Sequence, residues 1–226
     1  GGKSPFIITE EADLDAAINF GINDVMVNTG QTCNALTRMI VHESRYDDAV
    51  NLAKSAAESL VVGDPTDPNV FVGPMSSAGQ KQTVLDYIDQ AISDGARLVT
   101  GGTDMPAGMS TGNYVSPTIF ADVTNDMNIA QEEVFGPVLV MIKYSTIDQA
   151  IDIANDTPYG LAAAVWAGDK DKATSIAKRI RAGQCAINGG DANHEAPFGG
   201  YKESGNGREF GDAGLHEYCE LKAMQY

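Results

Sequence analysis

Cys33 lies in the stretch NTGQTCNALTR, residues 28–38, where small and polar residues surround its thiol. A thiolate nucleophile needs partial exposure and nearby donors, and Thr32, Asn34 and Thr37 make this stretch polar. The stretch also connects a predicted helix to a predicted strand, and reactive groups are often found on such connections. Local chemistry alone leaves two interpretations open, because Cys33 is either a nucleophile or a small apolar filler in a turn.

A nucleophilic cysteine works with a base, and the chain has three histidines, His42, His194 and His216. Only His194, in the loop GGDANHEAPFGG, is placed where it could swing to Cys33. A Cys–His thiol hydrolase or acyltransferase is therefore one hypothesis, and its alternative is that His194 is an ordinary surface loop residue. A further hypothesis is a non-enzymatic assembly module in which Cys33 has no chemical role.

The run QEEVFGP, residues 131–137, places two carboxylates before a Phe and a Gly-Pro turn. A carboxylate can accept two hydrogen bonds from a vicinal diol such as a ribose, and an aromatic side chain can cover a planar ring. Adjacent carboxylates more commonly just face solvent. The run by itself is weak evidence for a nucleotide site.

The glycine-rich segment APFGGYKESGNGREFG, residues 196–211, resembles a dinucleotide phosphate loop only superficially. The GxGxxG spacing fails, since GNGREFG has one residue too many before its last glycine, and no predicted strand leads directly into it. We expect these glycines to form tight turns and Lys202, Arg208 and Glu209 to form structural ion pairs.

The composition limits the class of protein. The 226 residues are 43% hydrophobic and 20% charged, which is typical of a globular domain, and the net charge of −16 disfavours nucleic acid as a partner. Cys33, Cys185 and Cys219 have neither a disulfide pattern nor the spacing of a zinc site, which favours a reducing, cytoplasmic setting. No apolar run is long enough to cross a membrane, and no signal peptide is recognisable.

The elements that must position these residues alternate between helical and β-rich segments. We expect helices over residues 13–27, 46–60, 77–94, 147–155, 169–181 and 210–217. We expect strands over 38–42, 96–100, 114–123, 138–144, 161–167, 184–188 and 218–226. Such alternation, with nearly continuous apolar strands, predicts an α/β domain with a largely parallel sheet. The last strand has nothing after it to pair with, so it joins the sheet or reaches a partner chain.

Five motifs in this order, GGKSP, GQTC, EEVFGPV, PYGLAAAVW and PFGGYKESGNGRE, make the chain similar to the aldehyde dehydrogenase superfamily. The similarity runs from Gly1 to Tyr226 and rests mainly on GQTC and EEVFGPV occurring together. It implies a three-layer catalytic domain over residues 1–217 and an oligomerisation strand over 218–226, in a homo-oligomer that would be a dimer or a tetramer.

The resemblance also implies a role for each site residue. Cys33 would attack an aldehyde carbonyl, pass a hydride to NAD or NADP, and release an acid from a thioester. Glu133 would bind the nicotinamide ribose, and Phe135 would pack near the nicotinamide ring. Asn188 would lie near the active site and Phe198 near the substrate tunnel, with residues 189–196 forming a variable substrate loop.

One departure from the family pattern affects the expected activity. The family places its general-base glutamate two residues before the first glycine of GGKSP, and this chain starts at that glycine, Gly1. We therefore expect the base, an oxyanion-binding asparagine and the cofactor-binding domain to lie outside this chain, and the chain alone to be inactive. The identity of the aldehyde and the choice between NAD and NADP stay open.

Overall fold

A computed structural model describes residues 1–226 and contains the expected alternation of helices and strands. The strands are β1 (Pro5–Ile8), β2 (Arg38–His42), β3 (Arg97–Thr100), β4 (Thr118–Ala121), β5 (Val138–Tyr144), β6 (Ala164–Trp166) and β7 (Ala186–Ile187). The α-helices are α1 (Leu14–Met26), α2 (Tyr46–Glu58), α3 (Ala78–Ser93), α4 (Asn128–Gln131), α5 (Ile147–Asn155), α6 (Lys170–Ala177) and α7 (Gly211–His216). Short 3₁₀ turns cover Val27–Gly30, Glu43–Arg45 and Lys202–Ser204.

The seven strands form one sheet in the order β3-β4-β5-β2-β1-β6-β7. All neighbouring strands run parallel except β3 and β4, which pair antiparallel. Pro5 lies beside Arg38, which in turn lies beside Val140, so the three central strands begin at nearly the same level. The prediction of a largely parallel sheet is confirmed.

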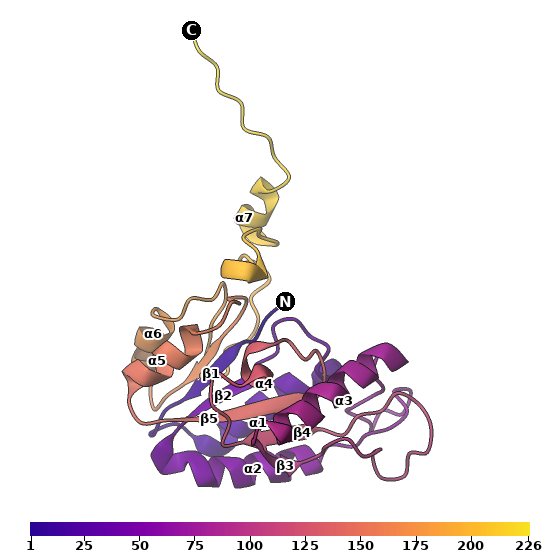
Figure 1. The fold of residues 1–226 in the computed structure, drawn as a ribbon. Coiled ribbons are helices and arrows are strands. Elements are labelled where there is room, and N and C mark those ends of the chain that lie inside the picture. Colours follow the sequence, from indigo (N-terminus) through magenta and orange to yellow (C-terminus); the bar gives the residue numbers. More distant parts are fainter.

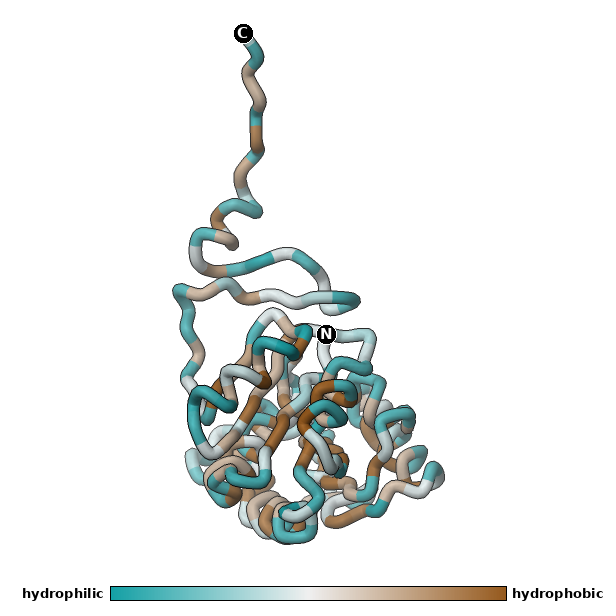
Figure 2. Tube along the Cα trace, turned by 90° about the vertical axis from the view of Figure 1, so that its left-hand side faces the viewer, coloured by the Kyte–Doolittle hydropathy of each residue, from teal (hydrophilic) through white to brown (hydrophobic).

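Helices cover both faces of this sheet, so the domain has three layers (Figure 1). Helices α1 and α2 pack with Phe6 and Met39 on one face, where they form one hydrophobic cluster. Helices α3, α4, α5 and α6 pack with Ile7 and Ile40 on the other face, in a second cluster. Because side chains alternate along a strand, neighbouring residues of β1 and β2 serve opposite layers. Figure 2 shows the apolar segments gathered inside this body and hydrophilic segments around it.

The predicted strand over 38–42 and the predicted helix over 147–155 match β2 and α5 at both ends. Strand β1, however, was not predicted, although it lies between β2 and β6 in the sheet. Its run PFII has only four residues, which is too short for periodicity to separate a buried strand from another apolar segment. None of the helices is long and apolar enough to cross a membrane.

In the single chain residues 218–226 form no strand and do not join the sheet, so that alternative is wrong, while the alternative that they reach a partner chain stays a prediction. They extend away from the body after α7 (Figures 1 and 2). The side chains of Tyr218, Leu221, Met224 and Tyr226 are exposed. A strand needs a hydrogen-bonding neighbour, and this segment is not among the strands of the sheet.

Candidate active site

The residues singled out in the sequence converge at the amino ends of the parallel strands. Gly2 precedes β1, Cys33 precedes β2 and Glu133 precedes β5. Since these three strands are neighbours in register, the segments leading into them meet at one edge of the sheet. Ligands of open α/β sheets are usually found at the opposite, carboxyl edge. The candidate residues therefore lie at the edge opposite to the one where the sheet pattern alone would predict a site.

The turn that leads to Cys33 has an unusual backbone. Asn28, Thr29 and Gly30 all have positive φ, at 51°, 59° and 70°. This conformation is costly for Thr29, whose side chain is β-branched, so neighbouring groups must hold it. The Thr29 hydroxyl donates to the Gly73 carbonyl at 3.1 Å, and the Gln31 side-chain oxygen accepts from the Ser76 N–H at 2.8 Å. Contacts with the segment after α2 thus fix the shape of the turn.

The two diagnostic motifs touch at a pair of glycines. A methyl group added at Gly30 would overlap the carbonyl of Gly136, and would lie 2.7 Å from the nitrogen of Pro137. Only a residue without a side chain, and one that tolerates a φ of 70°, fits this position. The contact joins the GQTC turn to the EEVFGP loop, which lies about a hundred residues further along the chain.

Helix α3 holds the EEVFGP loop from the other side. The Gln80 side-chain amide donates to the carbonyls of Val134 and Phe135, each at 3.1 Å. Phe135 has a φ of 54° and 38% of its surface is exposed, so its ring stands out of the loop rather than entering the core. An aromatic residue held in this conformation is strained, and such strain is common where a side chain must be aimed at a ligand.

The Glu133 carboxylate lies against the start of the chain. Its Oε1 accepts a hydrogen bond from the Gly2 N–H at 2.9 Å, and its Oε2 lies on the side of Gly1 where a side chain would be. A carboxylate has room for several donors, so Glu133 can accept from a further hydroxyl while it keeps the Gly2 contact. Glu133 thus offers acceptors that the hydroxyls of a ribose could use, and Phe135 offers an exposed ring that could cover a planar ring.

Cys33 is half-buried, and two peptide N–H groups beside its thiol have no partner in the chain. The N–H groups of Cys33 and Asn34 donate no hydrogen bond within the chain. Free N–H groups next to a nucleophile can stabilise an oxyanion. His194 is exposed and packs edge-on against Phe210, with ring centroids 5.7 Å apart, and it makes no hydrogen bond to Cys33. The geometry therefore gives no support to a Cys33–His194 pair.

Cys185 lies in a different environment from Cys33. Burial raises the pKa of the Cys185 thiol to about 12, so it stays protonated at neutral pH. It lines a cavity of about 510 Å³, together with Asn34 and the loop 189–193. This volume suits a small organic molecule. The predicted substrate loop thus lines a cavity that extends to Asn34, the residue after Cys33.

Asn188 and Phe198 both have roles in the backbone framework. The Asn188 side-chain oxygen accepts from the Ala167 N–H at 2.8 Å and extends the pairing of β6 and β7. Phe198 exchanges two backbone hydrogen bonds with Glu209, each at 2.7 Å. Their predicted positions near substrate stay predictions.

Two cations are buried where β1 and β2 begin. Arg38 makes four hydrogen bonds, to the carbonyls of Lys3, Ile153 and Ala154 and to the side chain of Asn125, at 2.7–2.9 Å. Lys3 is 1% exposed and its amine has no partner. Burial, reinforced by the Arg38 charge, lowers the pKa of Lys3 to about 7, while Glu133 and Glu132 oppose that shift.

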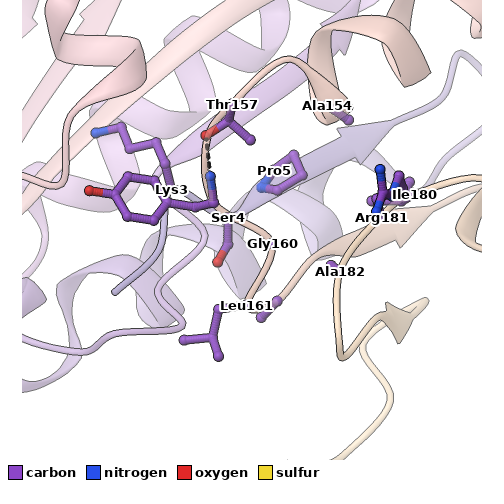
Figure 3. Close-up of a pocket in the computed structure, with 12 residues that line it drawn as sticks. Lys3, Ser4, Pro5, Ala154, Thr157, Gly160, Leu161, Ile180, Arg181 and Ala182 are labelled. Atoms are coloured by element: carbon purple, nitrogen blue, oxygen red, sulfur yellow. Dashed lines mark hydrogen bonds between the residues drawn. The ribbon is translucent and has the colours of Figure 1, made fainter. Parts of the chain in front are cut away.

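The surroundings of Lys3 are shown in Figure 3, where Ser4 and the turn at Gly160 and Leu161 lie beside it. The cavity here measures about 10 Å³, which is room for no more than a water molecule. Substrate cannot bind there. The larger cavity next to Asn34 has room for a small organic molecule.

The ion pairs predicted for the glycine-rich segment are wrong. The Lys202 amine donates to the carbonyls of Asn155 and Thr157, at 2.7 and 2.9 Å. Arg208 donates to the carbonyls of Gly200, Asn206 and Gly207 at 2.8–3.1 Å. Arg208 thus satisfies carbonyls of the glycine-rich segment itself, and Lys202 satisfies carbonyls at and just after the end of α5.

Arg38, Gln80 and Ser204 support the site but were not found from the sequence. Their partners are backbone carbonyls and N–H groups in distant segments, and such partners leave no sequence pattern. The paired glycines Gly1 and Gly2 did carry a signal, because adjacent glycines before an apolar run indicate close approach of another backbone.

Comparisons with known proteins identify the family of the chain. A sequence model of the aldehyde dehydrogenase family matches residues 1–224. The chain is 45% identical to a 3-succinoylsemialdehyde-pyridine dehydrogenase from a Pseudomonas species. The aligned region covers 99% of this chain and 47% of that protein. A putative aldehyde dehydrogenase from Staphylococcus saprophyticus is 46% identical over the same shares.

Solved structures give the same result. A mutant of aldehyde dehydrogenase C from Pseudomonas syringae, in complex with NAD⁺ and octanal, superposes with a TM-score of 0.97 at 47% identity, over 99% of this chain and 46% of that one. An aldehyde dehydrogenase from Mycobacterium tuberculosis with NAD⁺ gives a TM-score of 0.94 at 46% identity, over 96% and 45% of the two chains. The chain thus spans about half the length of these relatives.

Proposed function

This chain belongs to the aldehyde dehydrogenase family, and from that premise we propose that it is the catalytic part of a longer enzyme that oxidises an aldehyde to a carboxylic acid with NAD or NADP. The observation that carries the proposal is the contact between Gly30 and Gly136, which brings the Cys33 turn and the Glu133 loop to one edge of the sheet. The NAD⁺ bound in similar structures supports the choice of cofactor class.

Cys33 is the proposed nucleophile. Its thiolate attacks the aldehyde carbon, a C–S bond forms, and the carbonyl oxygen becomes an oxyanion. The N–H groups of Cys33 and Asn34, which have no partner in the chain, are proposed to donate to that oxyanion. Covalent attachment holds the substrate carbon in place, which divides a difficult oxidation into easier steps.

Glu133 and Phe135 are the residues proposed to hold the cofactor. The free acceptor capacity of the Glu133 carboxylate suits the two hydroxyls of a ribose, and the exposed Phe135 ring can limit the movement of a flat ring beside it. The bound nicotinamide supplies the acceptor for the hydride that leaves the substrate carbon. The thioester left on Cys33 is then hydrolysed, as water breaks the C–S bond and the thiol is restored.

The general base for that hydrolysis is proposed to come from the segment that joins Gly1 in the longer protein. The hydrogen bonds on Gly1 and Gly2 would hold such a group close to Cys33. We further propose that residues 218–226 pair with a second copy of the protein, since their apolar side chains are exposed in the single chain. Sedimentation of the protein with and without this segment tests that pairing.

The test of the main proposal is the Cys33→Ala variant of the full-length protein. NADH formation from a panel of aliphatic and aromatic aldehydes should fall by at least about a thousandfold, because removing the group that forms the covalent bond removes the reaction path. Gly207→Ala, where an added methyl group meets no atom within 4 Å, is the control and should retain activity. The chain 1–226 alone should form no NADH. Equal activity in Cys33→Ala and wild type would contradict the proposal.

A further inference from the structure

The two glycines that open the chain contact two different parts of the site. On Gly1, a methyl group would overlap the Oε2 atom of Glu133. The next residue, Gly2, donates its N–H to Oε1 of the same carboxylate at 2.9 Å. The Glu133 carboxylate therefore rests on the bare Cα of Gly1 and on the peptide N–H of Gly2.

Gly2 also touches the backbone of the nucleophile. A methyl group built on Gly2 would lie 2.6 Å from the carbonyl oxygen of Cys33. A backbone carbonyl cannot rotate away as the end of a side chain can, so any side chain at Gly2 must displace the Cys33 turn. Gly1, by contrast, faces only the movable end of a glutamate side chain.

Both glycines are held in place from behind. The Ser204 hydroxyl donates to the Gly1 carbonyl at 2.7 Å and accepts from the Gly160 N–H at 3.0 Å. Arg38 donates from its side chain to the Lys3 carbonyl at 2.9 Å, and from its backbone N–H to the Ser4 carbonyl at 3.2 Å. A segment fixed at successive residues passes a displacement at one end to the other, instead of absorbing it.

We propose that Gly1 and Gly2 are positioning residues that couple Glu133 to Cys33, with Gly1 seating the carboxylate and Gly2 seating the backbone of the nucleophile. This proposal rests on the proposed function, because it takes Glu133 as a ligand of the nicotinamide nucleotide and Cys33 as the nucleophile. A cofactor that binds Glu133 then shifts the backbone position of Cys33, and with it the reactivity of the thiol, through Gly1 and Gly2.

The experiment compares Gly1→Ala and Gly2→Ala in the full-length protein, with Gly207→Ala as the matched control, because a methyl group on Gly207 meets no atom within 4 Å. Two quantities are measured in each protein. The first is the dissociation constant for NAD⁺. The second is the rate constant for alkylation of Cys33 by iodoacetamide, with and without saturating NAD⁺, followed by mass spectrometry of the Cys33 peptide so that Cys185 and Cys219 do not contribute.

In the wild type, NAD⁺ should change the alkylation rate of Cys33 by about threefold or more. Gly1→Ala should weaken NAD⁺ binding by about tenfold or more, since small misplacements of a binding group are costly. Its alkylation rate without NAD⁺ should stay within about twofold of wild type, and saturating NAD⁺ should no longer change that rate. Gly2→Ala should alter the alkylation rate without NAD⁺ by about fivefold or more. Gly207→Ala should match the wild type in every measurement.

Wild-type NAD⁺ affinity and wild-type coupling in Gly1→Ala, or wild-type Cys33 reactivity in Gly2→Ala, would overturn the proposal. If Gly2→Ala does not fold, as judged by circular dichroism, Ser204→Ala replaces it, because that variant releases Gly1 without adding an overlapping atom. Ser204→Ala should reduce the effect of NAD⁺ on alkylation, and an undiminished effect would overturn the proposal. Neither readout needs aldehyde turnover. A wild type that shows the coupling but oxidises no aldehyde refutes only the proposed function.

Discussion

Arg38 and Lys3 are both buried cations at the start of neighbouring strands, but their surroundings differ completely. The Arg38 guanidinium makes four hydrogen bonds, two of them to carbonyls in the last turn of α5. The Lys3 amine makes none. Desolvation lowers the pKa of both groups, to about 10 for Arg38 and about 7 for Lys3. Burial therefore does not by itself assign a role to a charged residue, because its hydrogen-bond partners decide whether the charge stabilises or destabilises the fold.

The largest effect on stability is expected from Arg38→Met. This change leaves the carbonyls at the end of α5 and the carbonyl of Lys3 without a donor in the interior. Breaking a buried charged network in this way costs about 3–5 kcal/mol of unfolding free energy. Urea unfolding followed by circular dichroism measures it. Arg38→Lys keeps the charge but supplies fewer fixed donors, so its free energy of unfolding should lie between those of Arg38→Met and the wild type. A loss below about 1 kcal/mol for Arg38→Met would show that the network is not stabilising.

A smaller effect, of opposite sign, is expected from Lys3→Met. Replacing an unpartnered buried charge by an apolar side chain of similar volume should raise the unfolding free energy by about 1–3 kcal/mol at pH 6. The pKa of Lys3 is lower in the folded protein than in the unfolded chain, so the unfolded chain binds more protons between pH 7 and 10.5, the ordinary pKa of a lysine. The cost of Lys3 is then full below about pH 7 and fades as the pH rises towards about 10.

The measurement for Lys3 is therefore a difference between two proteins at two pH values. Urea unfolding of Lys3→Met and wild type at pH 6 and pH 9.5 should show a gain that shrinks at the higher pH. Taking the difference removes the titration of other groups that both proteins share. A gain that is constant with pH would mean that Lys3 has the same pKa in the folded protein as in the unfolded chain, and a loss of stability would mean that the amine has a partner in solution.

The smallest effect is expected at Arg179, whose guanidinium forms an exposed ion pair with Asp148 at 2.8 Å. The two side chains are 50% and 79% exposed, so water screens their attraction. Arg179→Met should change the unfolding free energy by less than about 1 kcal/mol, and less still at high salt. Arg179→Met and Arg38→Met make the same chemical change, the loss of one guanidinium group, at an exposed and at a buried position. A loss at Arg179 as large as that at Arg38 would show that burial and carbonyl partners are not what distinguishes the two arginines.

Much of this fold follows from local sequence pattern. The β-rich run RMIVH and the amphipathic segment 147–155 each satisfy one periodicity without competition, so their ends were predicted correctly. Residues 218–226 have the composition of a strand, but a strand also needs a neighbour, and the chain offers none. For β1 the prediction failed in the opposite sense. Its four residues were not predicted as a strand, but they form one because β2 and β6 pair with them on both sides.

The candidate site divides in the same manner. Cys33, Glu133 and Phe135 could be nominated from two short motifs, since their residue types carry the chemistry. The support around them could not be nominated, because Gln80, Arg38 and Ser204 bond to backbone atoms, and every residue offers the same backbone atoms. The predicted ion pairs of Lys202 and Arg208 failed for this reason, as both cations bind carbonyls instead.

The sequence by itself determined the alternation of helices and strands, the family and the cysteine to be tested. Only the tertiary structure decided that the site lies at the amino edge of the sheet, that Arg38 is satisfied and Lys3 is not, and that two glycines separate Glu133 from Cys33. The physical reason is distance along the chain. Local propensities act over a few residues, whereas the bond from Ser204 to Gly1 joins groups 203 positions apart, and packing of the whole domain is needed to bring them together.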